Sequence, residues 1–175
     1  EKLRKTTFAG EEKINSDTLI DTHGAYVVAP RNVAHRLNVP FVDATKITHD
    51  IETELGIAGS RKLHMWFRPG ECSQIPKGRQ DNTHYNVYGA RLVANALADE
   101  IGKQVPELKK HVRHYDYVVS TRGRGNYFTL QDAVDAVPAG KRVKVLVLDG
   151  SWKKPENMKG KKIKFILQFG AKITD

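Results

Sequence analysis

Apolar residues recur every three or four positions in three stretches of the chain, the spacing that places them on one face of a helix. The first stretch predicts a helix over roughly 28–37, and the third predicts a helix from about 86 to 103. The second follows Asp43, a residue type that caps helix starts, and is closed by Gly56 and Gly59. The three patterns are carried by Tyr26, Val33, Ala34 and Leu37; by Ile47, Ile51 and Leu55; and by Ala90, Val93, Ala94, Leu97 and Ile101.

Between these helices, short apolar runs stand out from polar segments. Residues 39–42 form such a run and predict a buried strand, whereas residues 56–80 predict a loop with an apolar cluster at 64–67. An order of helix, strand, helix, loop and helix indicates the later half of an α/β sheet protein.

The pattern changes after a predicted hinge at 104–116. Residues 117–119 are strand-like, and Thr129 is a predicted N-cap for a short helix. Two apolar strands follow at 143–148 and 163–169 with no helix between them. This arrangement is typical of a stacked β architecture, so we expect these two strands to pair in parallel with each other and not with 39–42.

Length and composition limit the broad class. With 175 residues, of which 39% are hydrophobic, the chain can bury one or two modest cores. It has no apolar run near the ~18 residues that a membrane span needs, and its charged start does not resemble a signal peptide. The single cysteine, Cys72, cannot form an intramolecular disulfide, and it has no adjacent base that would make it a nucleophile.

The net charge of +9 is unevenly distributed. Residues 114–175 hold 12 Lys and Arg against six Asp and Glu, while residues 1–113 hold 17 against 14. Such an excess either faces solvent or attracts an acidic partner. No zinc-finger spacing, RNP-like strand or Arg-rich helix is present, so we expect no nucleic-acid partner.

The most distinctive motif is the segment Asp-Asn-Thr-His at 81–84, directly before the third helix. A carboxylate three residues before an imidazole can fix its tautomer, so that His84 acts as a general base and Asp81 orients it. Taken alone, the spacing equally fits a capping Asp beside a surface His.

The remaining candidates are open to two interpretations. Trp66 offers an aromatic face for a sugar ring or a core position in a strand, and His23 offers a substrate contact or a structural turn. Asn82, inside the motif, is a further candidate substrate contact. His35, His49 and His64 show no metal-ligand spacing, and His111 and His114 share a helical spacing but have no evident third ligand, so we expect no metal and no cofactor.

Residues from about 17 to 108 resemble the C-terminal portion of the rhamnogalacturonan acetylesterase branch of the SGNH hydrolases. The resemblance implies a three-layer α/β/α fold with His84 as base and Asp81 as orienting acid. If so, the pair should lie at the C-terminal edge of a sheet. The matching stretches are residues 21–26 (DTHGAY), 38–43 (NVPFVD), 66–71 (WFRPGE) and 81–90 (DNTHYNVYGA).

Residues from about 117 onward resemble the start of pectin methylesterases. The match is carried by Val118 and Val119, the segment 123–138 (GRGNYFTLQDAVDAVP) and the strand ending at Gly150. It implies the first coils of a right-handed parallel β-helix, whose open end is capped by the helix at 129–137.

Both resemblances are partial. The SGNH nucleophile and oxyanion-hole blocks are not found in these residues, and neither are the catalytic residues of pectin methylesterases. We therefore expect an SGNH part at 1–108, a linker at 109–116 and a β-helix start at 117–175, with the missing SGNH segment and the downstream β-helix elsewhere in a longer protein.

The resemblances imply a secreted or periplasmic carbohydrate esterase acting on pectic polysaccharide, both rhamnogalacturonan and homogalacturonan, without a membrane partner. One alternative is a non-catalytic binding or scaffold piece that retains esterase ancestry. Another is a complete binding module, but the incomplete catalytic sites argue against it.

Overall fold

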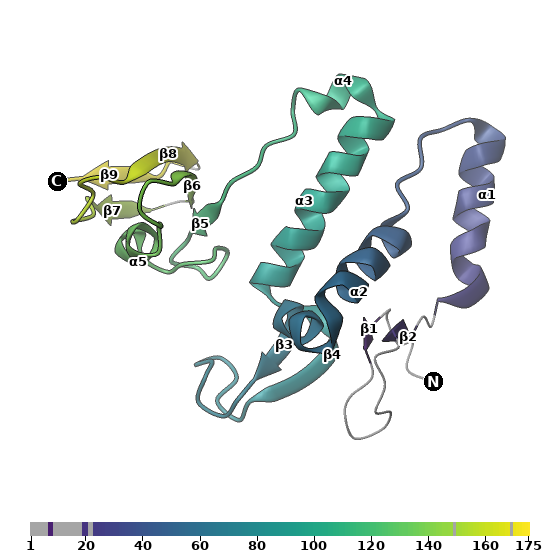
Figure 1. Cartoon of the computed structure of the whole chain (residues 1–175), viewed down its shortest axis with the longest axis horizontal. Helices are drawn as coiled ribbons and strands as arrows, with labels where there is room; N and C mark the ends of the chain where they lie inside the picture. Colours follow the sequence, from purple (N-terminus) through teal and green to yellow (C-terminus); the bar gives the residue numbers. More distant parts are fainter. Residues whose placement is uncertain (1–6, 9–18, 21–22, 149, 169) are drawn as a thin grey trace. The chain divides into compact units, whose positions relative to one another are not determined.

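The computed structural model describes residues 7–8, 19–20, 23–148, 150–168 and 170–175. The chain divides into two compact units, residues 1–112 and 113–175, which are described separately. Figure 1 shows helices dominating the first unit and short parallel strands the second. The fold is mixed α/β with small sheets.

Three main helices build the first unit. After the 3-10 helix η1 (Gly24–Val27) come α1 (Val28–Leu37), α2 (Ala44–Leu63) and α3 (Val87–Gln104), followed by the short α4 (Pro106–Lys109). The predicted helices at 28–37 and 86–103 are confirmed. Asp43 caps α2 as predicted, accepting a hydrogen bond from the Lys46 backbone N–H at 3.0 Å.

The second helix extends further than the sequence predicted. Gly56 takes a non-helical conformation (φ 63°, ψ −174°), which breaks the helix, but a second segment continues to Leu63. The predicted loop at 56–80 is therefore wrong for residues 57–63, which are helical. Gly56 changes the direction of the backbone, and the helical conformation resumes after it. After Leu63 the chain enters strand β3 (His64–Phe67) at once.

The strands of the first unit form two small antiparallel pairs. β1 (Thr7–Phe8) pairs with β2 (Leu19–Ile20), and β3 pairs with β4 (Arg79–Tyr85). The predicted strand at 39–42 is wrong: this segment is neither helix nor strand, and Val39 is half exposed. Pro40 lacks an N–H for a strand ladder, and Asn38 ends α1 in the left-handed region (φ 50°).

Parallel strands organise the second unit. The order in its larger sheet is β5 (Tyr117–Val119), β6 (Arg142–Leu148) and β8 (Lys162–Gln168), while β7 (Ser151–Lys153) pairs with β9 (Lys172–Thr174). The parallel pairing of the strands near 143–148 and 163–169 is confirmed, with Val143 opposite Ile163. Two successive strand–turn–strand segments thus stack on each other (Figure 1).

A helix closes the apolar side of this stack. Thr129 caps α5 (Leu130–Asp135) as predicted, its hydroxyl accepting a hydrogen bond from the Asp132 backbone N–H at 3.0 Å. The core that the helix and strands share consists of Val119, Leu130, Ala133, Val137, Val143, Val145, Val147, Trp152 and Ala171. Within the described residues, no helix is both long and apolar enough to cross a membrane.

Candidate functional site

The Asp81–His84 segment lies in an irregular part of strand β4. Met65 of β3 pairs with Asp81, but the next residue back, His64, pairs with Tyr85. Residues 82–84 therefore bulge from the ladder, a device that redirects side chains. The pair is expected at the C-terminal edge of a sheet, but among the described residues it lies in a bulge of an antiparallel hairpin.

Asp81 holds the bulge in shape through both of its carboxylate oxygens. Oδ1 accepts hydrogen bonds from the backbone N–H groups of Thr83 at 2.7 Å and His84 at 2.9 Å. Oδ2 lies 2.8 Å from Nδ1 of the His84 ring and 2.7 Å from Nη2 of Arg79. A single, mostly buried carboxylate therefore fixes both the backbone and the ring of the histidine.

The electrostatics keep Asp81 ionised. Burial acts to raise the pKa of its carboxyl, but the hydrogen bonds from the His84 backbone, the Thr83 backbone and the His84 ring outweigh burial and hold the pKa well below its usual value. Since an ionised carboxylate only accepts hydrogen bonds, Nδ1 of His84 carries the proton. The Nε2 lone pair is then available on a side chain that is 61% exposed.

Asn86 ties the bulge to the start of α3. Its side-chain oxygen accepts a hydrogen bond from the Gly89 backbone N–H at 2.9 Å, which caps the helix. Its amide nitrogen donates to the carbonyl oxygens of Lys62 at 2.8 Å and His64 at 2.9 Å. The end of α2, the start of β3 and the start of α3 are thus joined by one side chain immediately after the motif.

A glycine allows α3 to approach this junction closely. A Cβ at Gly89 would lie 2.2 Å from the carbonyl oxygen of Leu63, a separation that side chains do not adopt. The backbone of α3 therefore packs directly on the end of α2.

Two further candidates lie beside the pair. The indole N–H of Trp66 donates to Oδ1 of Asn82 at 2.7 Å, and the guanidinium carbon of Arg61 lies 4.6 Å from the Trp66 ring centroid. If Trp66 binds a sugar ring, the sugar must share the aromatic ring with the Arg61 guanidinium. His23 is the residue directly before η1.

A buried polar cluster lies behind the hairpin. Glu52 and Ser60 of α2 and His64 of β3 are almost completely buried, and the Ser60 hydroxyl donates to Glu52. His64 Nδ1 donates to the Ser60 carbonyl at 2.9 Å, while Nε2 lies 3.5 Å from the Glu52 carboxylate. Burial raises the pKa of Glu52, and burial together with the Glu52 charge raises the pKa of Tyr85 to about 12.

Sequence reasoning missed Arg79 and this buried cluster. Arg79 could have been found, because residues two apart in a strand share a face and Arg79 stands two before Asp81. Glu52 could not, since only the fold brings it to His64 and Tyr85.

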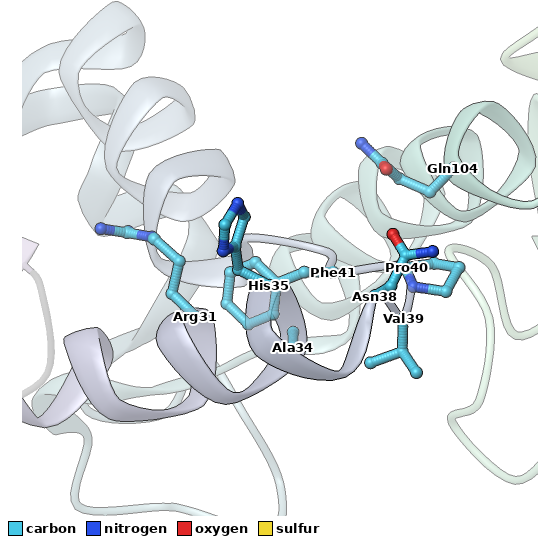
Figure 2. A pocket seen from close by; sticks show the side chains of 8 residues that line it. All are labelled: Arg31, Ala34, His35, Asn38, Val39, Pro40, Phe41 and Gln104. Atoms are coloured by element: carbon cyan, nitrogen blue, oxygen red, sulfur yellow. The ribbon is translucent and has the colours of Figure 1, made fainter.

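A hollow of about 490 Å³ lies at the end of α1, away from the motif in sequence (Figure 2). It is lined by Arg31, Ala34, His35, Asn38, Val39, Pro40, Phe41 and Gln104. None of the described residues that line it carries a carboxylate, so they offer His35 no orienting acid. Across the described part of the chain, no group of three His, Cys, Asp or Glu side chains is placed to hold a metal ion.

Comparison with known proteins bears on the chemistry of this site. The chain is 35% identical over 91 residues to the rhamnogalacturonan acetylesterase of Bacillus subtilis (strain 168). The chain is related to a carbohydrate esterase. The match covers 52% of the chain and 39% of the relative, so the chain spans well under half of the length of that protein. No protein-family model and no solved structure matches the chain.

An esterase relation raises the question of the nucleophile. Among the described residues, the His84 ring is hydrogen-bonded to Asp81 and to no serine hydroxyl. Ser60 is buried and donates to Glu52 instead. The geometry thus supplies an oriented, solvent-facing imidazole.

Proposed function

We propose that this chain contributes the acid–base part of a carbohydrate esterase that removes acetyl groups from rhamnogalacturonan. The observation that carries the proposal is the 2.8 Å contact between Asp81 Oδ2 and His84 Nδ1, with the His84 ring exposed. The substrate is suggested by the name of the bacterial relative.

The proposed mechanism is acyl transfer through a serine. His84 Nε2 removes the proton as the serine oxygen attacks the acetyl carbonyl, and the ionised Asp81 stabilises the imidazolium that forms. His84 then returns the proton to the departing sugar oxygen. Water, deprotonated by the same nitrogen, releases acetate and restores the serine.

We propose that the nucleophile and the oxyanion hole come from polypeptide outside these 175 residues, in the missing part of a three-layer α/β/α SGNH domain. Two findings support this. The match spans only 39% of the relative's length. The first unit also leaves large apolar side chains half or more exposed, namely Tyr26, Leu37, Val39 and Tyr88.

For the second unit we propose the start of a pectin methylesterase β-helix. The parallel register supports this, because Arg142 lies opposite Lys162 and Ser151 opposite Lys172 in consecutive strand–turn–strand segments. Gly150 and Gly170, with φ of 80° and 76°, turn the chain at equivalent points. Acetylesterase and methylesterase activities would then act on the same pectic polymer, outside the cytoplasm where such polymers occur.

The test is a side-by-side assay of the full-length gene product on acetylated rhamnogalacturonan and on methyl-esterified pectin. We expect acetate from the first substrate and methanol from the second. Acetate without methanol would contradict the methylesterase part. Binding to both polymers without release of either product would contradict both parts and favour the non-catalytic alternative.

A further inference from the structure

The outer face of the second unit's sheet carries a regular array of cations. The parallel register places Arg142 opposite Lys162 and Lys144 opposite Lys164. Neighbouring strands are about 4.8 Å apart, and alternate residues along a strand about 6.6 Å apart. We call these four side chains the cationic ladder. All four are exposed.

The ladder occupies one end of its face, and the positions that follow it on that face are Leu146 and Ile166, then Leu148 and Gln168. Val143, Val145 and Val147, which alternate with the ladder positions on β6, point into the core beneath α5. Further along the ladder's own face, Leu146 and Leu148 are buried with Val118. The cations are thus held on a rigid, parallel sheet and not on a mobile loop.

The four cations are not neutralised within the described part of the chain. None of them forms an ion pair there. The Asp116 carboxylate accepts a hydrogen bond from the backbone N–H of Lys144 at 2.8 Å. Like charges directly opposite each other destabilise a sheet, so the ladder does not serve folding.

Protection of a sheet edge does not account for the ladder either. Lysines on an edge strand discourage pairing with other chains, which would explain Lys162 and Lys164 on β8. However, β6 lies between β5 and β8 and is paired on both sides. Arg142 and Lys144 therefore protect no edge.

We propose that the cationic ladder binds the carboxylates of a polyuronate chain, such as de-esterified galacturonan, and holds this polymer on the protein. The choice of a polyuronate rests on the proposed function. Closely spaced cations on a flat face suit a linear polymer that repeats a carboxylate on each sugar. Nucleic acid is the weaker fit, because β6 and β8 carry no aromatic side chain on the ladder's face to stack a base, and Tyr115, which packs against the apolar part of this face, is partly buried.

The test measures binding of polygalacturonate to the 175-residue chain by calorimetry at low salt. The double variant Lys144→Gln/Lys164→Gln should bind about tenfold more weakly and with a shallower salt dependence, because fewer counterions are released. Lys144→Arg/Lys164→Arg should bind like the unaltered chain. The matched control, Lys77→Gln/Lys109→Gln, removes the same charge from exposed lysines of the first unit and should change affinity less than about twofold.

Three results would overturn the proposal. One is unchanged affinity in the Lys144→Gln/Lys164→Gln variant whose circular dichroism shows it folded. Another is an equal loss of affinity in the Lys77→Gln/Lys109→Gln control, which would show that binding depends on the net charge of the chain and not on the ladder. The third is tighter, ladder-dependent binding of single-stranded DNA, which would indicate a nucleic-acid surface. Because the measurement involves no ester hydrolysis, ladder binding without acetate release by the full-length protein would contradict only the proposed function.

Discussion

At the scale of single residues, Asp81 determines the geometry of the site. Its carboxylate contacts the Thr83 and His84 backbones, the His84 ring and the Arg79 guanidinium. Hydrogen bonds to a charged group are roughly twice as strong as those between neutral groups. The orientation of His84 therefore depends on the charge of this one carboxyl group.

We predict that Asp81→Asn lowers the free energy of unfolding by about 1–3 kcal/mol at pH 7. The folded-state pKa of Asp81 is lowered, so its stabilisation is complete above the unfolded-state pKa of about 3.9 and is lost as the pH falls towards the folded-state value. The difference between wild type and variant should thus narrow below pH about 4 in urea denaturation.

Asp50→Asn is the matched control for this measurement, because Asp50 pairs with Lys46 on an exposed face of α2. It should change stability much less than Asp81→Asn does. A wild-type–variant difference for Asp81 that stays constant from pH 7 to pH 2 would contradict this account.

At the scale of elements, the contact of α3 with the end of α2 holds the hairpin and the motif in place. We predict that Gly89→Ala destabilises the chain by about 2–3 kcal/mol, because the new methyl group would meet the Leu63 carbonyl oxygen at 2.2 Å. The measurement is the midpoint of chemical denaturation. It should be accompanied by a change in the NMR shifts of the His84 ring, since the motif directly precedes this contact.

The control is the same substitution on the same helix. At Gly102 the nearest atom to a new Cβ is a Val112 methyl group at 3.1 Å, and alanine favours the helix by about 1 kcal/mol over glycine. Gly102→Ala should therefore be close to neutral. Equal effects of the two substitutions would refute the close-approach explanation.

The sequence predicted the helices better than the strands. Apolar residues at helical spacing identified α1 and α3, and Thr129 and Asp43 marked helix starts correctly. Strand β4 carries almost only polar residues, so it shows no apolar alternation that would predict a strand. Its pairing with β3 depends on tertiary contacts that no local pattern encodes.

The candidate site was predictable to a similar degree. The spacing of Asp81 and His84 indicated their hydrogen bond, which the structure contains at 2.8 Å. Their roles in catalysis stay a prediction. The pairing of Glu52 with His64 left no sequence signal, because the two residues belong to different elements.

At the scale of the whole molecule, the two units differ in how much they bury. Among the described residues, the buried apolar side chains of the first unit are Ala34, Leu63 and Val93, whereas the second unit has a continuous core. Since the apolar area removed from water drives folding, the second unit should be the more stable.

Hydrogen exchange measures this difference. We predict that the amides of β6 and β8 exchange most slowly and those of α1 most rapidly, because local stability follows the density of buried contacts. Stronger protection of α1 than of β6 in the 175-residue chain would contradict the burial argument.

The 175-residue chain should not hydrolyse esters by itself. A general base without a serine in reach and without an oxyanion hole cannot catalyse acyl transfer. Loss of such groups lowers kcat by several orders of magnitude. The measurement is turnover of p-nitrophenyl acetate. Ordinary turnover that His84→Ala abolishes would reveal a nucleophile among these residues and refute the proposal that it lies elsewhere.

The central claim, that His84 is the base of an esterase, is tested most directly by acetate release from acetylated rhamnogalacturonan by the full-length protein. We predict that His84→Ala lowers kcat by about 10⁴-fold or more. His49→Ala, which alters an exposed histidine of α2, should leave kcat unchanged. A His84→Ala protein that releases acetate at the wild-type rate would contradict the account.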